Sequence, residues 1–257
     1  MGTAGERLQN LNAGAVKRSV RGDKLFLQVV HALAREIVRA GGERIIFPSE
    51  PELCQMFGVS RTVLREAVKV LEAKGLVEVG HGQGVKSRER SDWNHLDPDV
   101  LNWQCEFGAD KKFLLDMNEI RLIFEPAAAA LAASRGDDAA HARIKAYYSQ
   151  MEEYVDNAEM FIQADLAFHR EIIMACGNDI LTGIALSVGI ALRASENVSI
   201  QVPGWARSLQ LHSALSDAIT RRDPEAARAA MTVIIHGAIA DIHVVLGTRS
   251  PSSSAAV

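Results

Sequence analysis

Aromatic residues and cysteines are scarce in this sequence. Phe, Trp and Tyr make up 5% of the 257 residues, whereas alanine runs are frequent. Alanine favours helices and aromatic residues favour strands, so the composition indicates a mainly helical fold rather than a β-sandwich. Hydrophobic residues reach 48%, which is enough for a buried core, and the 23% of charged residues argues against wholesale disorder. A chain of this length suits two domains.

Long hydrophobic runs and paired cysteines are also missing. The longest apolar stretch, 180–192, is interrupted by polar residues and glycines and is shorter than the ~20 residues of a membrane span. The first residues have no signal-peptide pattern. Three scattered cysteines show no metal-binding spacing and leave an odd number for disulfides: Cys54, Cys105 and Cys176. We therefore expect a cytoplasmic protein without a membrane partner.

The net charge of −4 conceals an asymmetry along the chain. Residues 1–91 hold 15 Lys and Arg against 10 Asp and Glu, whereas residues 92–257 hold 13 against 22. A basic part joined to an acidic part is typical of a nucleic-acid-binding module attached to a separate domain. Two ordinary domains can also differ in charge by chance, so the motifs have to decide.

Two capped helical segments follow a first helix that ends at Gly41-Gly42. Ser49 and Glu52 match a capping box, and Ser60 is an N-cap for the second capped helix. That helix has one apolar stripe, formed by Leu64, Ala67, Val68 and Leu71. Its basic residues recur every four positions on an exposed face: Arg61, Arg65 and Lys69. Two such helices predict a helix-turn-helix whose second helix enters the major groove, the alternative being merely solvated surface charges.

A β-hairpin is predicted directly after these helices. Residues 75–79 and 85–87 have strand character, and the glycine-rich turn 80–84 lies between them. A turn without bulky side chains lets backbone amides approach phosphate or the floor of the minor groove. Three helices and this hairpin together predict a winged helix-turn-helix.

About sixty residues of this region carry a family resemblance, in the motifs Pro48 to Glu50, Glu52-Leu53, Phe57 to Arg61, Leu64 to Val68, Lys74 to Val77 and Gly80 to Gly84. They resemble the DNA-binding domain of the GntR family of bacterial transcription regulators. The resemblance implies that double-stranded operator DNA is bound by Arg61, Thr62, Arg65 and Lys69, and by His81 and Gly82 at the wing tip. Pro51 departs from the family pattern, because many relatives have an arginine there, and this implies a missing DNA contact.

Every segment after residue 97 is predicted to be helical. Asp97 and Pro98 have the residue types of a helix start. Pro126 is expected to kink or break a long helix. We therefore expect an N-terminal arm at 1–22, the winged helix at 23–87, a linker at 88–97, an all-helical bundle that senses a ligand at 98–249 and a disordered tail at 250–257.

Four side chains of the expected bundle have the chemistry of a metal site. Asp165 and His169 lie one turn apart on one predicted helix, and His212 and His236 lie on later helices. Three imidazoles and one carboxylate suit Zn²⁺, Ni²⁺ or Mn²⁺ and leave coordination positions for a ligand. No signature such as His-Glu-x-x-His is present, so ordinary helix histidines are the alternative.

Further motifs extend the resemblance over the bundle: Glu119 to Arg121 with Glu125, Asp165 to His169, Gly177-Asn178, His212, and Val233 to His236. In order and spacing they resemble the ligand-binding FCD domain of the FadR-like branch of GntR regulators. The resemblance implies that the aspartate and three histidines hold a divalent metal, with Zn²⁺ first and Ni²⁺ or Mn²⁺ as alternatives. It also implies that Arg121 clamps a small carboxylate effector, unless Arg121 and Glu125 form a surface ion pair.

Two more residues are expected near the effector. Ser208 lies one helical turn before His212 and can bind a sugar hydroxyl, and Asn178 can line the pocket. An ordinary helix serine and a helix cap are the alternatives. The segment from Trp93 to Trp103 resembles the same segment of galactonate and other sugar-acid regulators, which implies an aldonate or hexuronate effector.

The expected function is an effector-responsive transcription regulator without enzymatic activity. As a homodimer on a palindromic operator, it would repress a sugar-acid operon and be released by the acid. Two alternatives stay open at this point. One is a metal-dependent hydrolase with an accessory DNA-binding domain, in which Glu125 or Glu171 acts as the base. The other is a DNA-binding protein with a purely structural metal.

Overall fold

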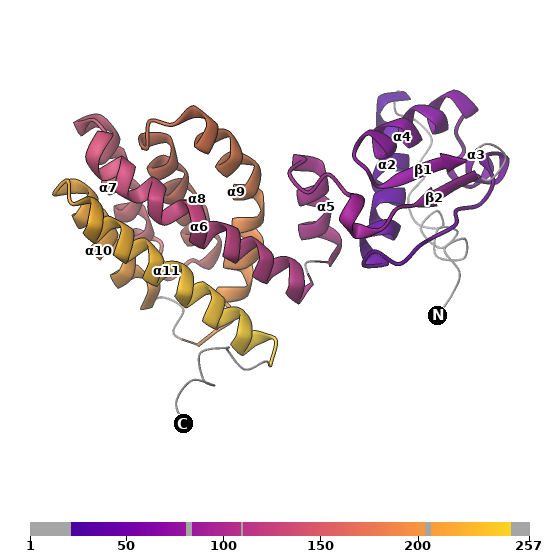
Figure 1. Cartoon of the computed structure of the whole chain (residues 1–257). Helices are drawn as coiled ribbons and strands as arrows, with labels where there is room; N and C mark the ends of the chain where they lie inside the picture. Colours follow the sequence, from indigo (N-terminus) through magenta and orange to yellow (C-terminus); the bar gives the residue numbers. More distant parts are fainter. Residues whose placement is uncertain (1–21, 81–83, 109, 204–206, 248–257) are drawn as a thin grey trace. The chain divides into compact units, whose positions relative to one another are not determined.

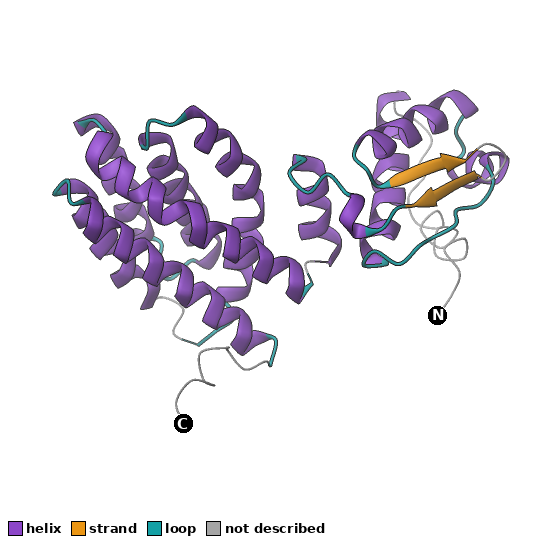
Figure 2. Cartoon of the chain, viewed as in Figure 1, coloured by secondary structure: helices purple, strands orange, loops and turns teal. Residues whose placement is uncertain are grey.

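The computed structural model describes residues 22–80, 84–108, 110–203 and 207–247, and the chain forms two compact units (Figure 1). Unit 1 ends at Gly108 and unit 2 begins at Ala109. Helices dominate both units, and the only strands of the described ranges lie in unit 1 (Figure 2). The mainly helical fold is therefore confirmed. The expected tail and all but the last residue of the expected arm lie outside the described residues.

Unit 1 contains the predicted winged helix. Its helices are α2 (Gly22–Arg39), α3 (Glu50–Phe57) and α4 (Arg61–Ala73), and its strands are β1 (Val77–Gly80) and β2 (Gly84–Ser87). The strands pair antiparallel, with Val77 opposite Ser87. One hydrophobic core joins the helices to the hairpin and includes Leu33, Leu53, Leu71 and Val77, all of them fully buried.

Local signals in the sequence determine where α3 and α4 begin. The amide of Ser49 donates to Glu52 Oε2 at 2.8 Å, as the capping box requires. The Ser60 hydroxyl accepts a hydrogen bond from the Val63 amide at 3.3 Å. Gly58 ends α3 in the left-handed conformation, with φ 63°. The expected apolar stripe of α4 is buried, so its basic face is left exposed.

The boundary between the two units lies later than expected. Residues 88–97, expected as a linker, pack on the winged helix: Trp93 is 5% exposed, and the Asn94 amide donates to the Lys74 carbonyl at 3.0 Å. The next helix, α5 (Pro98–Gly108), contacts α2, and its Trp103 lies in the core of unit 1. The described structure thus places α5 with the winged helix, because its apolar face completes that core. A helix start at residue 98 does not reveal which core the helix joins.

Unit 2 is a helical bundle. Its helices are α6 (Lys111–Arg135), α7 (Asp138–Glu153), α8 (Ala158–Ala175), α9 (Asp179–Ser199), α10 (Ser208–Thr220) and α11 (Pro224–Val245). Helix α6 continues through Pro126, so the break considered at that residue does not occur. Helix α8 packs against α6, α7 and α9, and α10 packs against α11, α7 and α6. Side chains on α8 and α10 can therefore meet inside the bundle.

Helix α11 is long and apolar enough to cross a membrane by length and composition alone, the one such helix among the described residues. Ala227, Met231 and Ile235 of this helix are fully buried in the bundle core. The core helix of a soluble bundle meets the same criteria, so α11 is weak evidence for a membrane span.

Two glycines test whether residues 88–97 are packed as described. Gly75 and Gly58 both have left-handed φ values, 76° and 63°. A Cβ on Gly75 would lie 2.3 Å from the Asp92 carbonyl oxygen, whereas a Cβ on Gly58 would meet nothing within 4 Å. We expect Gly58→Ala to lower the free energy of unfolding by about 1 kcal/mol through backbone strain. Gly75→Ala should cost about 2 kcal/mol more, because Asp92 must move. Urea unfolding of both variants measures this, and equal losses would mean that residues 88–97 are a loose linker.

Candidate functional sites

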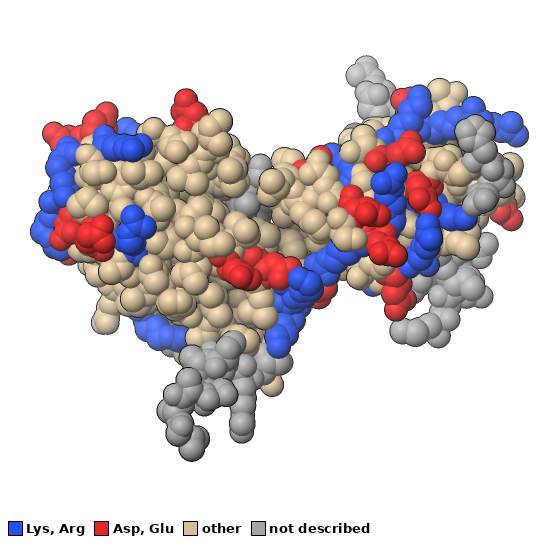
Figure 3. Space-filling view, in the orientation of Figure 1, with Lys and Arg blue, Asp and Glu red and all other residues tan. Residues whose placement is uncertain are grey.

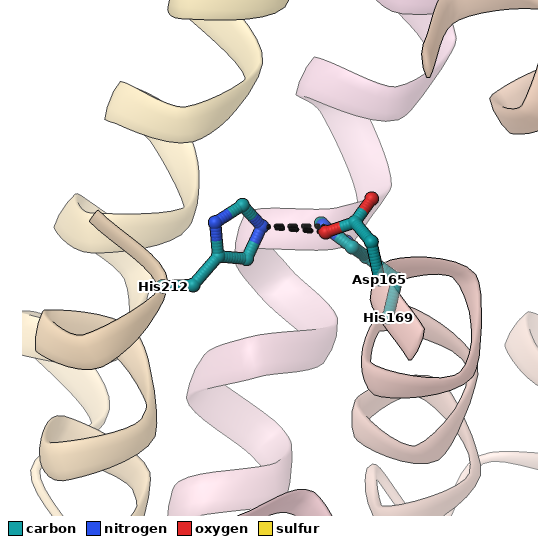
Figure 4. A group of neighbouring side chains, drawn as sticks. All are labelled: Asp165, His169 and His212. Carbon is teal, nitrogen blue, oxygen red and sulfur yellow. Dashed lines mark hydrogen bonds and ion pairs between the residues drawn. The ribbon is translucent and has the colours of Figure 1, made fainter. Parts of the chain in front are cut away.

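Three buried side chains converge inside unit 2 (Figure 4). Asp165 and His169 come from α8, and His212 comes from α10. His212 Nε2 lies 2.9 Å from Asp165 Oδ1 and 3.3 Å from His169 Nε2, and His169 Nε2 lies 3.8 Å from Asp165 Oδ1. Ligand atoms bound at about 2.0–2.2 Å to a tetrahedral ion lie roughly 3.3 Å apart. The three donor atoms therefore form a triangle of the size of one face of a coordination shell.

Hydrogen bonds orient both imidazoles with Nε2 toward this triangle. His169 Nδ1 lies 2.9 Å from Glu125 Oε2, and His212 Nδ1 lies 2.8 Å from the Ser208 carbonyl oxygen. A carboxylate and a carbonyl can only accept, so each Nδ1 carries the proton and donates it. Nε2 of each ring is thereby directed at the triangle, as in histidines that bind a metal through Nε2 and donate Nδ1–H to an outer acceptor.

The Asp165 carboxylate has the two histidines for partners. Both of its oxygens are buried, and Oδ1 is paired with His212 Nε2 at 2.9 Å. Burial by itself would raise the pKa of Asp165, but the neighbouring His212 and His169 outweigh it and lower this pKa. Burial alone would lower the pKa of His212, but Asp165 outweighs it and raises this pKa, so a proton on His212 compensates the carboxylate. A divalent cation bound between these groups would take the place of that proton. One oxygen and two nitrogen donors fit a divalent cation of the kind expected from the sequence.

The expected fourth ligand, His236, is not part of this group. His236 is exposed on α11, whereas Ile234 and Ile235 beside it are buried. Successive helix positions differ by about 100° in direction, so the next residue after two inward positions points outward. The helical phase of α11 thus leaves His236 out of the group that Asp165, His169 and His212 form, and its expected role as a ligand has no support in the described structure.

Arg121 and Glu125 form a buried pair behind the histidines. Arg121 is 1% exposed, and its Nε donates to Glu125 Oε1 at 2.7 Å. Its Nη1 donates to Asn118 Oδ1 at 3.1 Å, and its Nη2 is buried without a hydrogen-bond partner. Burial alone would raise the pKa of Glu125, but Arg121 and His169 lower it to about 2. The surface ion pair considered above is thus excluded, and Glu125 connects Arg121 to His169.

A cavity lies against the metal-site histidine from α10. It is small, about 50 Å³, and partly open to solvent, and its wall comes from α8, α9, the first turns of α10, and α11. Its lining residues are Phe161, Glu196, Ser199, Ile200, Arg207, Ser208, Leu211, His212, Ile234, Gly237, Ala238 and Asp241. Ser208 lines it as expected. Asn178 does not, because its exposed side chain caps α9 by accepting from the Leu181 amide at 3.1 Å.

Sequence reasoning missed Glu196 of α9. Its carboxyl faces the cavity, and burial together with the nearby Asp165 charge raises its pKa to about 8. A single acidic residue near the end of an apolar helix gives no sequence signal of such a position. The structure also removes both candidates for a hydrolytic base. Glu125 is held by Arg121 and His169, and Glu171 by Arg143, whose Nε lies 2.7 Å from its Oε1.

The basic face of α4 is exposed on unit 1. Arg61, Arg65 and Lys69 have side chains that are 72%, 66% and 69% exposed, and Thr62 is exposed beside them. Lys and Arg gather over the part of unit 1 that contains α3 and α4 (Figure 3). His81 and Gly82, expected at the wing tip, lie outside the described residues. The exposed face is one helix wide, which fits the major groove, and it is positively charged, which attracts the DNA phosphates.

One acidic residue, Glu50, lies within this basic face. Its Oε2 is 3.0 Å from Arg65 Nε and its Oε1 is 3.9 Å from Arg61 Nε. Glu50 is the first residue of α3, where the helix dipole favours a carboxylate. Contacts through Nε leave the terminal Nη groups of both arginines for guanine edges. Sequence reasoning assigned Glu50 only to a motif, because partners fifteen residues apart are not visible in helical spacing.

Comparisons with known proteins agree with the two units. Residues 25–86 match the model described as "Bacterial regulatory proteins, gntR family", and residues 116–237 match the FCD domain. The chain is 34% identical over 190 residues to the galactonate operon transcriptional repressor of Escherichia coli K12, covering 73% of this chain and 83% of that protein. It is 30% identical over 213 residues to the transcriptional repressor NanR of Citrobacter rodentium, covering 81% of each.

Solved structures show the same fold at lower identity. Lar, described as controlling the agr system of Listeria monocytogenes, matches with a TM-score of 0.60 and 18% identity, over 89% of this chain and 99% of that one. McbR of Escherichia coli matches with a TM-score of 0.50 and 19% identity, over 88% and 99%.

Two single variants test which histidines bind the metal. Loss of a residue that only hydrogen-bonds to a metal ligand typically weakens metal binding by about 10–100-fold. We expect His212→Ala to weaken Zn²⁺ binding by more than this, because it removes a donor atom. His236→Ala should leave the affinity unchanged, because His236 is exposed away from the group. A competition titration with a chelator measures both, with Asp165→Asn as a second ligand variant. Equal losses at His212 and His236 would contradict the three-residue site.

A matched pair of acidic variants tests the role of Glu50. We expect Glu50→Gln to lower the ratio of operator to random-DNA affinity by about fivefold, because Arg65 and Arg61 lose the group that holds them. Glu66→Gln on α4 removes an equal charge and frees Lys69, whose Nζ lies 2.8 Å from Glu66. It should leave the ratio unchanged in fluorescence-anisotropy titrations. An identical fall in both variants would show that only the net charge matters.

Proposed function

Because the chain belongs to the GntR family of bacterial regulatory proteins and has an FCD domain, we propose that it represses a sugar-acid catabolic operon and is released from DNA by the acid. Family membership makes the chain a DNA-binding transcription regulator rather than an enzyme. The observation that carries the proposal is the convergence of Asp165, His169 and His212 in the bundle, because His212 also lines a cavity. Its place of action is the cytoplasm, where operator DNA is found.

Operator recognition is assigned to unit 1. Arg61, Thr62, Arg65 and Lys69 of α4 are proposed to enter the major groove, and the wing residues His81 and Gly82 to reach the minor groove. A homodimer would present two such helices to the two halves of a palindromic operator. The proline at position 51 removes the arginine contact of many relatives, so the operator preference is proposed to differ from theirs.

Effector binding is assigned to the metal site and the cavity. A bound divalent cation, with Zn²⁺ as the first candidate and Ni²⁺ or Mn²⁺ as alternatives, would supply positive charge and open coordination positions for a carboxylate. Arg121 supports this assignment, since its buried Nη2 has no partner and a carboxylate is the acceptor that a guanidinium pairs with best. Ser208, on the cavity wall, is proposed to bind a hydroxyl of the acid.

The relatives favour a sugar acid as the effector class. The first relative is described as a galactonate operon repressor, and its sequence aligns over both units of this chain. A ligand bound at His212 and Ser208 contacts α10, while Asp165 and His169 belong to α8. If the effector binds one arrangement of these helices more tightly than another, it shifts the population toward that arrangement. The resulting change in operator affinity cannot exceed the difference between the effector's affinities for the two arrangements.

An operator-release titration tests this function. The full-length protein first selects its operator from a random duplex library, and anisotropy then follows binding with Zn²⁺ present. We expect an aldonate such as galactonate to weaken operator binding by about 10–100-fold, and EDTA to abolish the response. Arg121→Lys should reduce the response, because a single ammonium cannot pair bidentately. Arg143→Lys, at the exposed Glu171 pair, serves as the matched control.

The alternatives give different results in the same titration. A DNA-binding protein with a purely structural metal keeps its operator affinity at every acid concentration. Such an outcome for a panel of aldonates and hexuronates would overturn the proposed function. Release by the acids in the presence of EDTA would overturn the role of the metal.

A further inference from the structure

Part of the cavity wall is an ion pair that the metal site does not use. Arg207, directly before α10, pairs through Nη2 with Asp241 Oδ1 of α11, and both residues line the cavity. The Arg207 side chain is 53% exposed, whereas that of Asp241 is 11% exposed. The pair therefore extends from solvent to the inner wall of the cavity, and it joins α11 to the helix that holds His212.

The charges of the cavity wall favour a neutral part of the ligand over a second carboxylate. Among the lining residues, Glu196 and Asp241 are acidic and Arg207 is the only Lys or Arg. A second carboxylate would meet the charged Asp241 here, and it would gain little from an arginine that is already paired with that residue. The wall thus suits the neutral part of an effector, while the carboxylate is better placed at the Arg121 and metal side.

The chemistry of the pair suits hydroxyl groups. A hydroxyl both donates and accepts hydrogen bonds, and a guanidinium beside a carboxylate offers donors and acceptors at neighbouring positions. Ser199 and Ser208 add two more hydroxyls to the same wall. The rest of the wall is mainly apolar and includes Phe161, Leu211 and Ile234. It is therefore at the pair itself that an alkyl chain would cover polar groups without replacing their hydrogen bonds with water, which costs binding free energy.

We propose that Arg207 and Asp241 form a polyol subsite, which binds the hydroxyl groups of the effector and restricts the effector to polyhydroxylated acids. This inference rests on the proposed function, because it takes a small carboxylic acid to occupy the cavity. Asp241 accepts hydrogen bonds from hydroxyls of the effector, and Arg207 donates to their oxygens. The two residues thereby determine specificity and take no part in holding the metal.

Calorimetric titration of the full-length, Zn²⁺-loaded protein with two six-carbon acids tests the subsite. Galactonate carries five hydroxyls and hexanoate carries none. We expect the wild type to bind galactonate at least about 100-fold more tightly. Asp241→Asn should weaken galactonate binding by about tenfold or more and leave hexanoate and Zn²⁺ binding unchanged. Arg207→Gln, on the more exposed partner, is the second variant and should act in the same direction.

Asp138→Asn is the matched control. Asp138 pairs with Arg222 at 2.8 Å but is 98% exposed and does not line the cavity, so its loss should change neither affinity. Unchanged galactonate binding in both cavity variants would overturn the subsite while leaving the proposed function intact. Equal losses for galactonate and hexanoate would also overturn it, since they indicate a structural role. A wild type that binds neither acid overturns the proposed function itself, and the subsite with it.

Discussion

The arrangement of polar groups inside the helical bundle depends on one buried carboxylate, that of Asp165. Asp165 is 1% exposed and ionised, and an isolated charge in such a place would be too costly to keep. Its compensation comes from two imidazoles, and each imidazole is oriented by a group that can only accept a hydrogen bond. Arg121 in turn neutralises Glu125, one of those two acceptors. The bundle therefore contains a connected series of charges, and the removal of any member leaves another one buried without a partner.

Helix α10 is where this series meets the cavity. Within little more than one turn of chain, Arg207, Ser208 and His212 offer a half-exposed cation, a hydroxyl and a metal-binding imidazole to the same space. A ligand that uses all three acts on one helix, while the remaining groups of the site belong to α6, α8, α9 and α11. Such a site is suited to sensing, because occupancy changes how strongly α10 is tied to its neighbours. The two carboxylates considered as bases for hydrolysis, Glu125 and Glu171, are already paired with arginines.

Local signals in the sequence predicted the winged helix well. The helix caps depend on hydrogen bonds between residues three positions apart, those of Ser49 with Glu52 and of Ser60 with Val63. The apolar stripe of α4 follows the helical period. Both signals can therefore be found in a single sequence. Three features needed tertiary structure. The phase of α11 decides that His236 points outward, the core of unit 1 decides where α5 belongs, and helix packing brings Glu196 to the cavity. In each case the deciding contact lies between segments far apart in the chain, where periodicity carries no information.

We propose that this chain holds a divalent metal with two imidazoles and one carboxylate rather than with the three imidazoles that the sequence resemblance implies. X-ray absorption spectroscopy of the Zn²⁺-loaded protein measures the ligand shell directly. The structure predicts two imidazole ligands, with the remaining ligands being oxygen at about 2.0–2.2 Å. A shell of three imidazoles, or one without histidine, would contradict it.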